Sequence, residues 1–199
     1  MESRIHFPRF VLAATVLAAS ASSAWAQDHG HRALLVSHPV LAASVERLTV
    51  ESPTWRDALS AVAATGRRTV LVTADKVNGT FDSEVLAQAR PIADDQARIE
   101  TVLVVINLEL LQRLSGLPVD AIQFKDDLDR IVAHEVYGHA VPFLLAGDSS
   151  GKCADPAPGQ SATNACAIKR ENQIRKELGL GQRYEYGREG LAIARRYWQ

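Results

Sequence analysis

The spacing of two histidines constrains the fold of this chain more than any other feature. His134 and His139 flank Glu135 in the segment HEVYGH, on a stretch with helical periodicity. On a regular α-helix, side chains five residues apart point about 140° away from one another. The two imidazoles can therefore reach one point only if the helix contains a wider turn, as a π-bulge provides. Gly138 lies inside this segment, and we expect its tolerance of unusual backbone angles to permit that turn.

The residue types in this segment indicate metal chemistry. Neutral imidazoles are good zinc ligands, and a carboxylate beside the metal can take a proton from water. We therefore expect His134 and His139 to bind zinc and Glu135 to act as the base. Glu135 and His139 would also suit an ordinary helical pair at a spacing of four. They fall on the same side as Leu128 and Val132, however, and clustered buried ionisable groups are candidates for a functional site.

A catalytic zinc ion usually takes three protein ligands and leaves a fourth position for water. Glu171 is the best candidate for the third ligand, because a carboxylate on an apolar helical face must be paired or metal-bound. The apolar residues on that face are Ala167, Ile168, Ile174 and Leu178. An ion pair with Arg175, four residues further on, is the alternative role for Glu171. Asp148 and Asp155, in a segment with loop composition, are the alternative ligands.

The segment HEVYGH resembles the HExxGH motif of the dipeptidyl peptidase III family of zinc exopeptidases. The resemblance implies His134 and His139 as zinc ligands and Glu135 as the residue that activates water. It covers this one motif, and the second, acid-rich motif of that family has no match here. The chain is also far shorter than members of that family, so release of dipeptides from a peptide's N-terminus does not follow.

Two further resemblances concern the region that follows the histidines. A helix carrying a glutamate after the histidine helix is similar to the gluzincin type of metallopeptidase. The run from Arg170 to Asn172, with Arg175, Arg183 and Tyr184 behind it, resembles small zincin-like domains of bacterial toxins and effectors. These similarities imply a zincin-like domain of α+β class.

Hydrophobic patterning predicts a short sheet packed against the histidine helix and C-terminal helices. The apolar runs 69–73 and 101–106 read as buried strands, with a weaker strand at 83–89. We expect strand 101–106 to line the cleft and to pair with an extended peptide substrate, as edge strands do. Helices are expected from Ser52 to Gly66, at 108–114, from Ala121 through the histidines toward Pro142, at 165–178 and at 188–197.

The N-terminus has the order of a secretory signal peptide. Arg4 and Arg9 precede an apolar run, and small residues lead to Ala26. We therefore predict a signal peptide at residues 1–26, a single domain at 27–199, and export to a periplasm or the medium. Removal of residues 1–26 leaves 173 of the 199 residues and changes the formal net charge from −1 to −2. This charge gives no reason to expect nucleic acid as a partner, and no apolar run is long enough to span a membrane.

The chain has two cysteines, Cys153 and Cys166. In an oxidising compartment they are expected to form a disulfide, which would close a loop rich in glycine, proline and serine. Two unpaired thiols are the alternative. No sequence feature fixes an oligomeric state.

These observations together predict a zinc metallopeptidase that hydrolyses peptide bonds of a peptide or protein substrate with a metal-activated water. The alternative is an exported zinc-binding structural or inhibitory domain in which Glu135 has no catalytic task.

Overall fold

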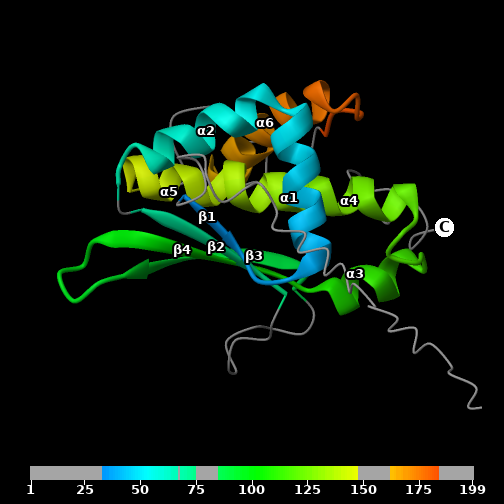
Figure 1. Ribbon diagram of the computed structural model, residues 1–199, viewed down its shortest axis with the longest axis horizontal. Coiled ribbons are helices and arrows are strands. Elements are labelled where there is room, and N and C mark those ends of the chain that lie inside the picture. Colours follow the sequence, from blue (N-terminus) through cyan, green and yellow to red (C-terminus); the bar gives the residue numbers. More distant parts are fainter. Residues whose placement is uncertain (1–32, 67, 75–84, 148–161, 184–199) are drawn as a thin grey trace, which may run out of the picture.

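The computed structural model describes residues 33–66, 68–74, 85–147 and 162–183. Within them the protein combines a four-stranded sheet with helices, which confirms the expected mixed α and β class. Figure 1 shows α1, α2, α4, α5 and α6 gathered on one side of the sheet. The predicted signal peptide, Cys153, Asp148, Asp155 and the expected helix at 188–197 lie outside the described residues.

The sheet has the strand order β1-β2-β4-β3. Strands β1 (Leu34–Val36), β2 (Thr69–Thr73) and β4 (Ile99–Ile106) run parallel, and β3 (Ala87–Ala93) runs antiparallel to β4. β2 and β4 are the two β-branched runs, and their inner positions are buried, as expected for strands in the middle of a sheet. Because β4 pairs with strands on both sides, the expectation that it offers a free edge to substrate is wrong. Among the described strands, β3 is the edge strand next to β4.

Two helices precede β2. Helix α1 (Pro39–Glu51) is followed by the single residue Ser52 and then by α2 (Pro53–Ala63). Ser52 is fully buried and caps α2, since its hydroxyl oxygen accepts a hydrogen bond from the backbone N–H of Trp55 at 3.0 Å. The predicted start of this helix is thereby confirmed. We made no sequence prediction for β1 or α1, because three residues are too few for a periodic pattern and α1 contains β-branched residues.

The histidines lie in the middle of one continuous helical rod. Helix α4 (Ile122–Ala133) leads directly into a π-helix, η3 (His134–Ala140), and then into α5 (Val141–Ala146), with helical backbone angles at each junction. Pro142 stands in the first turn of α5, where proline is tolerated, and Gly147 ends the rod in the left-handed conformation. The short helix α3 (Leu108–Ser115) comes before the rod, as expected, and α6 (Ala162–Glu177) packs against η3.

Candidate metal centre

The π-helix brings the two histidines together. In η3 the wider turn places Nε2 of His134 3.2 Å from Nε2 of His139, and the ring planes meet at 78°. The widened turn expected from the five-residue spacing is therefore confirmed. The two imidazoles present one ring nitrogen each to the same small space, which a regular α-helix would not allow.

Gly138 is required for a different reason from the one we expected. Its backbone does not adopt a positive φ, so special backbone freedom is not what it supplies. A methyl group built at Gly138 would instead lie 3.0 Å from Cβ and 3.2 Å from Cα of Ala167 in α6. Both distances are shorter than ordinary carbon contacts. The glycine therefore permits the close approach of η3 and α6.

That approach places Glu171 against the histidine pair. Glu171 is fully buried in α6, and its Oε2 lies 2.9 Å from Nδ1 of His134. Arg175 donates to Oε1 at 2.8 Å, and Arg183 donates to Oε2 at 3.2 Å. Burial raises the pKa of Glu171, but the hydrogen bond with His134 and the nearby positive charges outweigh it and leave the pKa below its ordinary value. The carboxylate is thus ionised and acts as an acceptor.

The ion pair with Arg175, which was the alternative role for Glu171, is present, and Glu171 contacts the histidine site as well. Its role as third zinc ligand stays a prediction. Within the described ranges, no group of three or more histidine, cysteine, aspartate or glutamate side chains is arranged to hold a metal ion. The described structure therefore has the imidazoles of His134 and His139 facing each other and the carboxylate of Glu171 at the far nitrogen of His134.

Glu135 lies on the sheet side of η3. It is 6% exposed, and its carboxylate accepts a hydrogen bond from the backbone N–H of Ala89 in β3. Burial raises the pKa of Glu135 above its ordinary value, because it outweighs the opposing effects of His134 and of the Ala89 N–H. A buried carboxylate with a raised pKa, held beside two histidines, is suited to accepting and releasing a proton.

His139 is neutral over the physiological pH range. Burial, with His134 and the positive charge of Arg170, lowers its pKa to about 4. A neutral imidazole keeps a lone pair on one nitrogen, which a metal ion or a hydrogen-bond donor can use.

No family model, curated protein or solved structure matches this chain. The case for its function therefore rests on the geometry of the site.

The contact of Arg183 with Glu171 was not predicted from the sequence, where Arg183 entered only through the resemblance to zincin-like domains. Asn172 holds the backbone of Arg183 with two hydrogen bonds, one to the carbonyl at 2.6 Å and one from the N–H at 2.8 Å. The guanidinium is thereby placed at Glu171, twelve residues earlier. No helical spacing relates residues so far apart, so the sequence pattern could not pair Arg183 with Glu171. The hydroxyl of Tyr137 in η3 donates a hydrogen bond to the side-chain oxygen of Gln173 in α6.

Two further expectations concern a disulfide and a membrane span. Cys166 is buried near the start of α6, and Cys153 lies outside the described residues, so the disulfide between them stays a prediction. No helix in the part of the chain that the structure describes combines the length and apolar character needed to cross a membrane.

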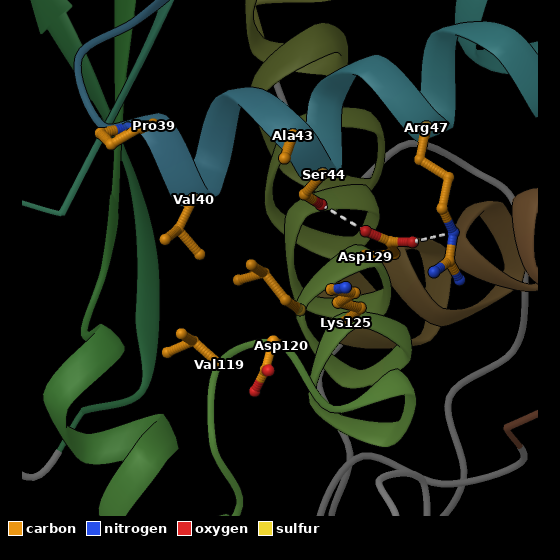
Figure 2. A pocket seen from close by; sticks show the side chains of 10 residues that line it. Pro39, Val40, Ala43, Ser44, Arg47, Val119, Asp120, Lys125 and Asp129 are labelled. Atoms are coloured by element: carbon orange, nitrogen blue, oxygen red, sulfur yellow. Dashed lines mark hydrogen bonds and ion pairs between the residues drawn. The ribbon is translucent and has the colours of Figure 1, made fainter.

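A pocket of about 330 Å³ lies apart from the histidines, between α1 and α4. Figure 2 shows Ser44 and Arg47 of α1 turned toward Asp129 of α4. Oδ1 of Asp129 accepts from the Ser44 hydroxyl at 2.5 Å, and Oδ2 lies 2.7 Å from Nε of Arg47. None of the lining residues belongs to the histidine site. Ser44, Arg47 and Asp129 are thus paired with one another on the wall of this pocket.

Proposed function

We propose that this chain is a zinc-dependent peptidase with a zincin-like catalytic domain. The observation that carries the proposal is the pair of Nε2 atoms of His134 and His139, 3.2 Å apart on a π-turn. Two nitrogen ligands that each lie 2.0–2.1 Å from a tetrahedral zinc ion are separated by about 3.3–3.4 Å. The spacing and chemistry of the two imidazoles therefore fit two of the three protein ligands of a catalytic zinc ion.

Each residue then has a defined task. His134 and His139 hold the ion through Nε2. Bound zinc supplies a lowered pKa for water and polarisation of the scissile carbonyl. Glu135 accepts the proton of the attacking water and passes it to the leaving amine, for which its burial and raised pKa suit it. The Ala89 N–H fixes the carboxylate of Glu135 in place between these transfers.

The substrate of this proposal is an extended peptide that pairs with β3. β3 lies at the edge of the described sheet and contacts η3, and its residue Ala89 touches Glu135. An extended peptide added to a strand edge gains main-chain hydrogen bonds that do not depend on its sequence. Pairing at β3 would thus bring a peptide bond near the base. The first part of the strand is half-buried, and its end, from Pro91 onward, is exposed.

The test uses the mature chain from residue 27 and its Glu135→Gln variant. We expect both to carry about one zinc per chain at neutral pH. Cleavage of a mixed peptide library should fall by about 10²–10⁴-fold in the variant, since the proton acceptor is lost while the histidines remain. Zinc binding without any cleavage by the unmodified chain would instead support a structural or inhibitory zinc domain. Less than about one zinc per chain would overturn the proposal.

A further inference from the structure

We propose that Glu171 is a positioning residue that fixes the ring of His134, and that it is not itself a zinc ligand. The inference rests on the zinc site proposed above and revises the third ligand that we expected from the sequence. The inference follows from the nitrogen of the His134 ring that the Glu171 carboxylate contacts. Oε2 of Glu171 contacts Nδ1 of His134, whereas Nε2 of the same ring faces His139.

Nδ1 and Nε2 point to opposite sides of an imidazole. An ion bound at Nε2 would lie roughly 6–7 Å from an oxygen hydrogen-bonded to Nδ1, against about 2.0–2.2 Å for a carboxylate bond to zinc. Glu171 cannot make both contacts with one oxygen. A carboxylate that holds the second nitrogen of a metal-binding histidine is a common arrangement, and it fixes the tautomer and the orientation of the ring.

The second carboxylate oxygen of Glu171, Oε1, is also hydrogen-bonded. Oε1 accepts from Arg175 at 2.8 Å, and Oε2 is shared by His134 and Arg183. Glu171 is fully buried, Arg175 is 3% exposed, and the side chain of Arg183 is 11% exposed. Turning the carboxylate toward a metal would break its ion pairs with the buried Arg175 and with Arg183, which is costly. The two arginines therefore hold Glu171 in the position from which it binds His134.

This arrangement determines which nitrogen of His134 donates to Glu171. The carboxylate accepts in this contact, so Nδ1 of His134 carries a hydrogen, and Nε2 is the nitrogen that a metal ion would bind. Glu171 thus prepares His134 in the tautomer that binds metal through Nε2.

The experiment measures zinc affinity of the mature chain by chelator competition, and by direct titration where binding is weak. We expect Glu171→Gln to weaken zinc binding by about 10–100-fold. The same substitution made in a His134→Ala chain should change affinity by less than about 3-fold, because Glu171 acts through His134. A loss of about 10-fold or more that persists without His134 would overturn the inference and make Glu171 a ligand.

Two controls separate this effect from damage to the fold. Glu171→Asp keeps a charge for the arginines but is too short to hold Nδ1 in the same place, and it replaces Glu171→Gln in the cycle if that variant does not fold. Asp129→Asn removes another buried carboxylate paired with an arginine, and we expect its zinc affinity to equal that of the unmodified chain. An equal loss in Asp129→Asn and Glu171→Gln would overturn the inference.

The tautomer gives a readout that does not depend on catalysis. Long-range ¹H–¹⁵N spectra of the mature chain should show the hydrogen of His134 on Nδ1, with and without zinc. A hydrogen on Nε2 of His134 in the zinc-free chain would contradict the inference. If the unmodified chain binds no zinc but shows the Nδ1 tautomer, the proposed function fails while the contact between Glu171 and His134 stands.

Discussion

Replacement of Gly138 by alanine tests whether the histidine helix depends on close packing with α6. The added methyl would meet Cβ, Cα and the carbonyl oxygen of Ala167 at 3.0, 3.2 and 3.3 Å. Optimal carbon contacts are about 3.5–4.0 Å, and two of these three atoms belong to the backbone and cannot rotate away. The helices must therefore separate by several tenths of an ångström.

The free energy of unfolding follows from two opposing effects. Overpacking of this kind costs about 1–3 kcal/mol, and backbone contacts favour the upper half of that range. Alanine gains about 1 kcal/mol over glycine in a helix interior. We therefore expect Gly138→Ala to be destabilised by about 1–2 kcal/mol. Because Glu171 follows Ala167 by one helical turn, its 2.9 Å contact with His134 should lengthen as well.

Urea unfolding of a chain that begins at residue 27, followed by far-UV circular dichroism, measures this change. Gly181→Ala is the matched control, since a methyl group there has no atom within 4 Å, and its stability should stay within about 0.5 kcal/mol of the unmodified chain. Adding Ala167→Gly to Gly138→Ala removes the shortest contact, so the double variant should be at least about 0.5 kcal/mol more stable than the two separate losses predict. A Gly138→Ala chain as stable as the original would refute the close-packing argument.

Two further predictions concern stability away from the site. Burial raises the pKa of Asp129 from 3.8 to about 6, so the folded state binds a proton more tightly than the unfolded state. The stability it contributes is fully present below pH 3.8 and is lost, by about 3 kcal/mol, as the pH rises to about 6. Asp129→Asn should lack this fall when unfolding free energies are compared from pH 4 to 7, and an unchanged pH profile would contradict it. Ser52→Ala should lower the unfolding free energy by about 1–2 kcal/mol, because the hydroxyl caps α2 at Trp55 and also donates to Glu177. Urea unfolding checks this as well, and a loss below about 0.3 kcal/mol would show that the cap is not needed.

The sequence predicted the elements in which side-chain period and capping are strong. The β-branched runs became β2 and β4, and Ser52 with Pro53 marked the start of α2. β3 extends to Ala93, beyond the predicted strand at 83–89, and it contains Pro91, which weakens a strand pattern. The edge position of β3 and the inner position of β4 depend on strand order, which no local pattern records.

The histidine spacing alone determined that the helix must widen, because 3.6 residues per turn cannot bring positions five apart to one point. The structure has that π-turn at His134–Ala140. Only the tertiary structure decided what surrounds it. The packing of Gly138 on Ala167 sets how closely α6 approaches, and this places Glu171 at Nδ1 of His134. The physical reason is that a helical pattern determines only the face of the helix on which Glu171 lies. The nitrogen of His134 that Glu171 contacts depends on the distance between η3 and α6.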